Sequence, residues 1–131
     1  MISLNGLICD SSKFDWIHDS GFRYGYGCFE TMRFYNNTVP FFDYHYNRLS
    51  QSLIDMGITY QTPKQQLLNR IEALFNAIQF KEEEMICRVY ISGGNVHLQP
   101  DFETNSNEII TLQSIINSPV NYGIEWVTVS P

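Results

Sequence analysis

The stretch SGFRYGYGCFETMRFYNNTVPFFDYHYNRLSQSL, from Ser20 to Leu53, predicts the centre of the fold. Its side chains alternate in character from Cys28 to Tyr35, which is typical of a β-strand. The pair Asn36-Asn37 then predicts a tight turn. An amphipathic helix is expected from Asp43, as its N-cap, to Met56. The stretch therefore predicts a strand, a turn and a helix that packs against the strand.

Alternation along the predicted strand places Phe29 and Glu30 on opposite faces. Glu30 shares its face with the apolar residues Met32 and Phe34. A carboxylate in such a setting needs a partner or a proton. The simplest structural explanation pairs it with an arginine, for example Arg88.

Arg48 lies in the second turn of the predicted helix, beside the apolar stripe of Leu49, Leu53 and Met56. Gly25 and Gly27 precede the strand and suit a positive φ or a close backbone approach. A basic residue early in a helix, next to such a turn, can hold an anion. The alternative is an arginine at the rim of a hairpin that packs on a helix.

Two motifs within this stretch resemble a known family. YGYGCFET, at Tyr24 to Thr31, is similar to the YG-D-G-hydrophobic-F/Y-E-T pattern of the class IV aminotransferases, and HYNRL at His45 to Leu49 is similar to their H-x-x-R-L. The 19 positions from Phe29 to Arg48 match the family separation. The likeness runs from Ile2 to Val129 and covers about half of a family member.

The resemblance implies a pyridoxal-phosphate enzyme and assigns roles to four residues of this stretch. Arg48 would bind the cofactor phosphate and Phe29 would line the substrate pocket, while Tyr24 and Glu30 would help to shape it. None of the three lysines, Lys13, Lys64 and Lys81, matches the Schiff-base lysine of the family. That lysine is expected beyond the chain end, so no catalytic residue is assigned and the chain alone is expected to be inactive.

Two positions depart from the family pattern. Tyr26 stands where relatives have Asp, and Ser92-Gly93-Gly94 stands where many have an S/T-R-G triplet whose arginine helps to bind the substrate carboxylate. A substrate carboxylate would then need another partner, for which His97 is the candidate.

The remaining elements predict an α+β fold. A hairpin is expected from Ile2 to Ile8, a second helix with Thr62 as its N-cap, and further strands at Met85–Ile91, Glu108–Ile115 and Gly123–Val129. The whole chain, 1–131, is expected to be one domain: an antiparallel or mixed sheet of about six strands with two helices packed on one side. It would correspond to the N-terminal domain of the family, without the C-terminal cofactor-lysine domain.

Composition narrows the functional class. The net charge of −6 and a pI near 4.8 argue against nucleic-acid binding. No apolar run approaches ~18 residues, and no secretory signal is apparent, so we expect neither a membrane span nor export. Cys9, Cys28 and Cys87 form no metal-binding pattern and are typical of reduced cytoplasmic thiols. His18 is expected to be a surface or capping histidine.

The resemblance implies an aminotransferase or lyase that acts on a small molecule, either an amino acid or aminodeoxychorismate. It favours 4-amino-4-deoxychorismate lyase, which forms 4-aminobenzoate and pyruvate on the folate route. A branched-chain or D-amino-acid aminotransferase is one alternative, and a truncated, non-catalytic folding or dimerisation module is another. Family members dimerise, so a homodimer is also expected, in the cytoplasm that the cysteines indicate.

Overall fold

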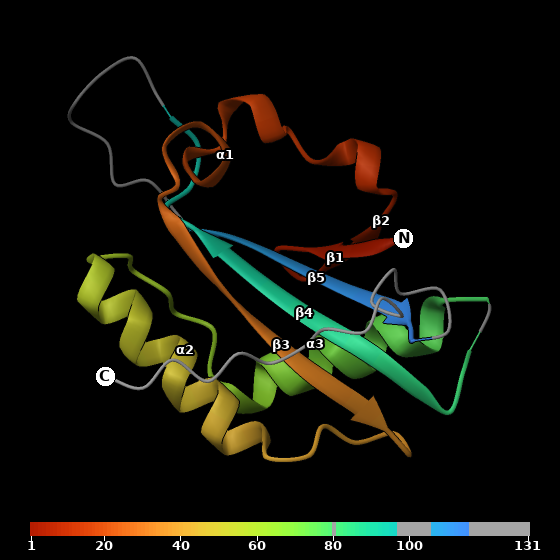
Figure 1. Cartoon of the computed structure of the whole chain (residues 1–131). Coiled ribbons are helices and arrows are strands. Elements are labelled where there is room, and N and C mark those ends of the chain that lie inside the picture. Colours follow the sequence, from red (N-terminus) through yellow and green to blue (C-terminus); the bar gives the residue numbers. More distant parts are fainter. Residues whose placement is uncertain (80, 97–105, 116–131) are drawn as a thin grey trace, which may run out of the picture.

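A computed structural model describes residues 1–79, 81–96 and 106–115, and it contains one five-stranded sheet of order β2-β1-β5-β4-β3 (Figure 1). Every neighbouring pair is antiparallel. The strands are β1 (Ile2–Leu4), β2 (Leu7–Cys9), β3 (Gly27–Tyr35), β4 (Glu84–Ser92) and β5 (Asn107–Ser114). This confirms the α+β prediction, and the five strands are close to the number expected. The strand predicted at Gly123–Val129 lies outside the described residues.

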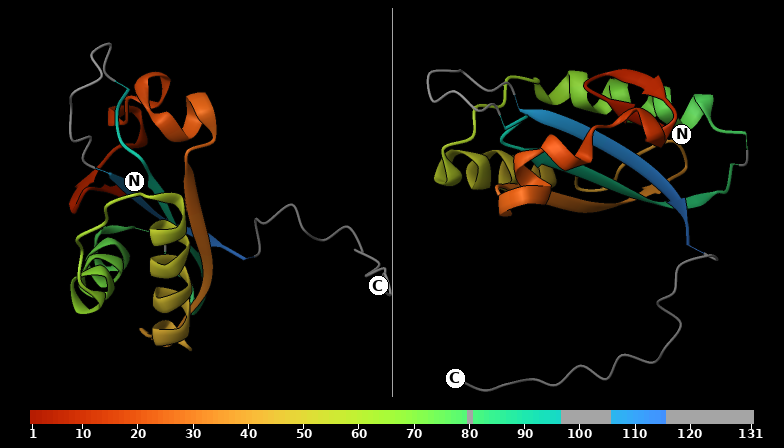
Figure 2. Two further views of the ribbon diagram at one scale, coloured as in Figure 1. Left: turned by 90° about the vertical axis from the view of Figure 1, so that its left-hand side faces the viewer. Right: turned by 90° about the horizontal axis from the view of Figure 1, so that it is seen from above.

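Both long helices, α2 (Phe42–Met56) and α3 (Lys64–Ala77), cover one face of the sheet (Figure 2), as predicted. The opposite face carries neither of them. Two short 3₁₀ helices, Ser11–Lys13 and Trp16–His18, lead into the five-residue helix α1 (Ser20–Tyr24). The core therefore lies between the sheet and the two long helices; its largest fully buried side chains include Phe34, Leu49, Leu53, Leu67, Ile71, Leu74, Val89, Ile91 and Ile110.

The predicted turns are confirmed by their backbone conformation. Asn36 and Asn37 have φ values of 49° and 57°, the left-handed region that asparagine tolerates. Asn5 and Gly6 have φ values of 50° and 86° between β1 and β2. Gly57, with φ 71°, ends α2.

Both predicted N-caps, Asp43 and Thr62, are wrong. α2 begins at Phe42, so Asp43 lies in its first turn, where its carboxylate pairs with Lys64 Nζ at 3.2 Å. α3 begins at Lys64 after Pro63, and the Thr62 side chain does not cap it. Instead, Thr62 Oγ1 accepts a hydrogen bond from Arg70 Nη1 at 3.1 Å. Tertiary partners therefore engage the side chains that the sequence pattern assigned to capping.

The glycine-rich entry to β3 behaves as predicted. Gly25 has φ 66° and ends α1. A Cβ added to Gly27 would lie 2.7 Å from the Ile91 carbonyl oxygen, so the two backbones approach too closely for any side chain. Among the described helices, none has the length and apolar character needed to cross a bilayer.

Candidate functional site

Arg48 on α2 and Glu30 on β3 are in direct contact. The Arg48 guanidinium donates from Nε to Glu30 Oε1 at 2.6 Å and from Nη2 to Oε2 at 2.7 Å. The pair is bidentate, the geometry for which a guanidinium is suited. The Glu30 side chain is 7% exposed and that of Arg48 is 52% exposed. A buried carboxylate therefore holds an arginine whose other donors lie toward solvent.

His45, one turn earlier on α2, completes this cluster. Its Nδ1 lies 2.9 Å from Glu30 Oε2, so the carboxylate contacts both α2 side chains. The Arg48 Cζ lies 5.3 Å from the centroid of the Tyr44 ring, a cation–π distance. His45 and Arg48 thus both contact Glu30, and Glu30 and Tyr44 together fix the direction of the guanidinium.

The charges of this cluster stabilise one another. Burial raises the pKa of Glu30, but hydrogen bonds from Arg48 and His45 outweigh it, so the pKa of that carboxyl lies below its usual value. The same hydrogen bonds with Glu30 raise the pKa of Arg48. Both groups are therefore charged at neutral pH.

The sequence interpretation that paired Glu30 with Arg88 is wrong. In the β3–β4 register Arg88 pairs with Thr31, which places it on the face away from the helices. There its Nη1 donates to Gln113 Oε1 at 3.0 Å. The face of each side chain follows from the register, which a single strand does not reveal.

Two further predicted site residues, Phe29 and Tyr24, take no part in the hydrogen bonds of the Arg48–Glu30 pair. Phe29 is exposed on the opposite face of β3, with its ring centroid 5.8 Å from that of Tyr90. Tyr24 is exposed at the end of α1, where Arg23 lies over its ring. His97 lies outside the described residues. The predicted cofactor and pocket roles of these side chains stay predictions.

The two departures from the family pattern, Tyr26 and Gly93, contact each other. A Cβ added to Gly93 would overlap the Tyr26 ring, and Gly93 N donates to the Tyr26 carbonyl oxygen at 2.9 Å. The Tyr26 hydroxyl donates to the Met56 carbonyl oxygen at 3.0 Å. The tyrosine therefore occupies the space of a side chain at position 93 and links the end of β4 to the end of α2.

We expect Gly93→Ala to destabilise the chain by about 1–3 kcal/mol, because the new methyl group overlaps the Tyr26 ring. In the Gly93→Ala/Tyr26→Ala double variant the overlap is gone. Its cost should be smaller than the sum of the single costs by about 0.5–3 kcal/mol, the range for residues in contact. Urea unfolding of the four proteins measures this difference. Strictly additive costs would contradict the contact.

Asp19 was not singled out from the sequence, yet it connects three elements. Its buried carboxylate accepts hydrogen bonds from the backbone N–H groups of Gly21 and Phe22, at 2.9 and 3.3 Å, and so caps α1. It also accepts from Ser92 Oγ and, at 2.9 Å, from Asn107 Nδ2. From the sequence, an aspartate before a short helix predicts only an N-cap. Its hydrogen bonds to residues 73 and 88 positions away cannot be predicted from the neighbouring residues.

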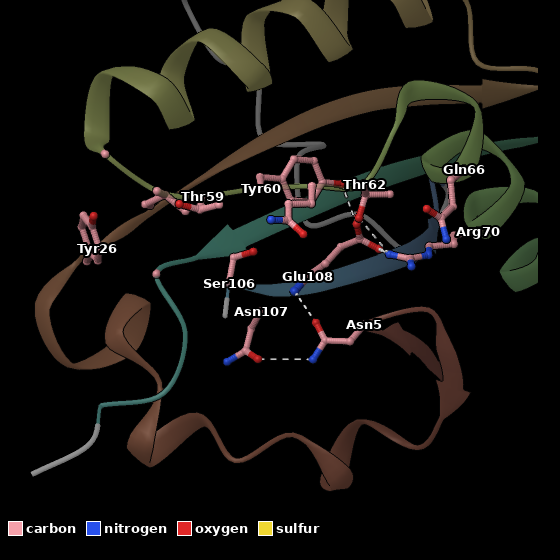
Figure 3. Close-up of a pocket in the computed structure, with 14 residues that line it drawn as sticks. Asn5, Tyr26, Thr59, Tyr60, Thr62, Gln66, Arg70, Ser106, Asn107 and Glu108 are labelled. Carbon is pink, nitrogen blue, oxygen red and sulfur yellow. Dashed lines mark hydrogen bonds and ion pairs between the residues drawn. The ribbon is translucent and has the colours of Figure 1, made fainter. Parts of the chain in front are cut away.

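A cavity of about 800 Å³ opens between the 57–62 loop and the start of β5 (Figure 3). Its wall contains a buried network in which Glu108 accepts from the Tyr60 hydroxyl at 2.5 Å and from Arg70 Nη1 at 2.9 Å. Burial and the adjacent Glu108 raise the pKa of Tyr60. Arg48 does not line this cavity, so the cluster around Glu30 is a separate site. Within the described ranges, no group of His, Cys, Asp and Glu side chains is placed to hold a metal ion.

Comparisons with solved structures place the fold. The branched-chain aminotransferase of Thermoproteus uzoniensis matches with a TM-score of 0.71 and 21% identity, over 85% of this chain and 39% of that one. The Escherichia coli branched-chain aminotransferase matches with a TM-score of 0.72 and 17% identity, over 85% of this chain and 39% of that one. The 4-amino-4-deoxychorismate lyase of Pseudomonas aeruginosa matches with a TM-score of 0.66 and 19% identity, over 87% of this chain and 39% of that one.

Sequence comparison identifies the family. The chain is 36% identical over 76 residues to the aminodeoxychorismate lyase of Bacillus subtilis (strain 168), which is 58% of this chain and 26% of that protein. The chain thus matches about a quarter of the length of this curated relative. The family model for amino-transferase class IV matches residues 27–130. Because this match takes in more than half of the sequence, the chain belongs to the class IV aminotransferase family.

Proposed function

We propose that this chain forms the phosphate-binding part of a pyridoxal-phosphate-dependent enzyme, and that the enzyme is an aminodeoxychorismate lyase. The observation that carries the proposal is the Arg48–Glu30 pair. Its buried carboxylate orients a half-exposed guanidinium at the position where H-x-x-R-L predicts a phosphate-binding arginine.

The residues present fit a phosphate group. A guanidinium has five N–H donors, and the two hydrogen bonds with Glu30 leave further donors on the exposed side of Arg48. The carboxylate removes the freedom of the side chain, so less conformational entropy is lost when an anion binds. Arg48 would therefore hold the phosphate, while Glu30 and His45 position Arg48.

When bound, pyridoxal phosphate supplies an electrophilic carbon and an electron-withdrawing ring that activates bonds at the substrate α-carbon. The residues of this chain would bind the cofactor phosphate and shield the substrate pocket from water. Arg48 fixes the phosphate end of the cofactor. Phe29 and Tyr24, which are exposed and aromatic, would line the substrate pocket and exclude water from it. His97 remains our candidate for the substrate carboxylate.

The lyase is preferred over the other class IV activities because of the 36% identity with the Bacillus subtilis enzyme. A branched-chain aminotransferase is the second candidate, since those structures superimpose at least as well on this fold. Under either proposal the substrate is a small molecule, and the enzyme is a cytoplasmic homodimer whose Schiff-base lysine lies in a C-terminal domain. A non-catalytic module is the third candidate.

An activity comparison separates these candidates. The protein, extended to the length of its relatives, would be incubated with pyridoxal phosphate and aminodeoxychorismate, and release of 4-aminobenzoate followed by fluorescence. A parallel reaction would offer leucine or a D-amino acid with a 2-oxo acid. We expect product in the first reaction and none in the second. Transamination alone would favour the second candidate, and inactivity in both would favour the module; the 131-residue chain serves as the control.

A further inference from the structure

A second cavity lies between α3 and the β1–β2 hairpin, remote from Arg48 in the fold. Its volume is about 320 Å³, and its lining includes Ser3, Ile8, Gln66, Asn69, Arg70 and Ala73. All of its lining residues belong to the described part of the chain. Arg70 is the one charged side chain among them.

Arg70 uses one of its nitrogens for both of its hydrogen bonds. Nη1 donates to Thr62 Oγ1 at 3.1 Å and to Glu108 Oε1 at 2.9 Å, on the side of the larger cavity (Figure 3). No hydrogen bond within the described residues engages Nε or Nη2. This edge presents two parallel N–H groups, the arrangement that binds a carboxylate in a bidentate manner.

Gly6 leaves the guanidinium accessible. A Cβ at this position would lie 2.9 Å from Nε, 3.0 Å from Cζ and 3.1 Å from Nη2 of Arg70. The three distances are nearly equal, so a side chain at position 6 would lie against the Nε–Cζ–Nη2 part of the guanidinium. Glycine at position 6 therefore leaves free the space beside Nε and Nη2 that any side chain would fill.

Ser3 adds an independent polar group. It is fully buried on the helix-facing side of β1, and its Oγ has no hydrogen-bond partner in the described structure. A buried hydroxyl without a partner is unfavourable. Ser3 lines the cavity together with Arg70, so an acceptor that displaces the atoms now covering the hydroxyl would satisfy it.

We propose that this cavity binds a small organic carboxylate with an apolar body. The Nε–Nη2 edge of Arg70 and the Ser3 hydroxyl would donate to the carboxylate, and Ile8 and Ala73 would contact the apolar body. Glu108 accepts a hydrogen bond from Arg70 only at Nη1, and it lines the larger cavity rather than this one. Because the chain carries a net charge of −6, its overall field repels anions, and binding would depend on this local arrangement.

Titration of the ¹⁵N-labelled chain with benzoate at constant ionic strength tests the proposal. We expect saturable shifts of the Ser3 and Gly6 amide signals and of Arg70 Nε–H, with a Kd on the order of 1–10 mM. Benzamide has the same shape without the charge and should bind at least about tenfold more weakly. Sulfate, which lacks an apolar body, should also be weaker. Equal affinity for benzamide or sulfate, or no saturable shift with benzoate, would overturn the assignment.

Variants locate the site. Arg70→Lys keeps a charge but loses the two-donor edge, and we expect a loss of about tenfold. Ala73→Glu introduces a competing carboxylate into the lining and should weaken benzoate by at least about fivefold. Asn76→Glu adds the same charge at an exposed α3 position outside the lining and should leave the affinity within about twofold. An equal loss in both glutamate variants would overturn the proposal even if Arg70→Lys failed to fold.

Discussion

Replacing Arg48 with alanine in the protein extended to the length of its relatives should weaken pyridoxal-phosphate binding by roughly ten- to a hundredfold. A hydrogen bond to a charged group is worth about 1.5–3 kcal/mol, which converts to that range. The expectation rests on a guanidinium that is held by Glu30 and is 52% exposed. Titration by cofactor absorbance measures the effect. Arg48→Lys should recover part of the affinity, because lysine restores the positive charge but not the paired N–H donors of the guanidinium.

Arg33 offers a matched control for this measurement. Arg33 lies on β3 and, like Arg48, it is exposed and paired with a glutamate, Glu84, but it faces away from the helices. Arg33→Ala removes the same charge and should leave cofactor affinity nearly unchanged. If Arg48→Ala binds the cofactor as tightly as the parent, then Arg48 is a rim arginine and the proposed phosphate site is wrong.

Leu53→Ala should lower the free energy of unfolding by about 2–5 kcal/mol, the range for deleting a buried leucine side chain. Leu53 is 2% exposed on the face of α2 that contacts the sheet. Its truncation would leave a cavity between α2 and β3. Chemical denaturation measures the loss.

Ile54, the next residue on α2, provides the control because its side chain is 69% exposed. Ile54→Ala removes a similar apolar group from the solvent side and should change stability by no more than about 0.5 kcal/mol. A loss below 1 kcal/mol for Leu53→Ala, or equal losses for the two variants, would mean that α2 does not bury this face.

The sequence predicted the faces of the elements well, because burial follows the periodicity of each element. Alternation placed Glu30 with Met32 and Phe34, and all three side chains are buried. The helical stripe placed Leu49 and Leu53 in the core in the same way. These predictions needed no knowledge of how one element lies against another.

Contacts between elements could not be predicted in this way. Arg48 and Glu30 were each identified, but their pairing depends on how α2 crosses β3, which no periodicity encodes. Tyr26 and Gly93 were each noted as departures, yet their contact appears only once the glycine turn and the end of β4 are adjacent. The N-cap predictions were wrong for a related reason: Thr62 has the residue type of an N-cap, but its hydroxyl accepts a hydrogen bond from Arg70.

The strand order has a consequence for how the chain folds as it is synthesised. β5 lies between β1 and β4, and Ser3 pairs with Ile110, so the N-terminal hairpin joins the sheet through the last described strand. Until the ribosome has released Asn107–Ser114, β1 and β4 have no shared neighbour. Contacts so distant in sequence slow folding, because a large loop must close before they form. The nascent chain must therefore keep the β1–β2 hairpin unpaired with the rest of the sheet until β5 has been synthesised, and the five-stranded sheet can form only then.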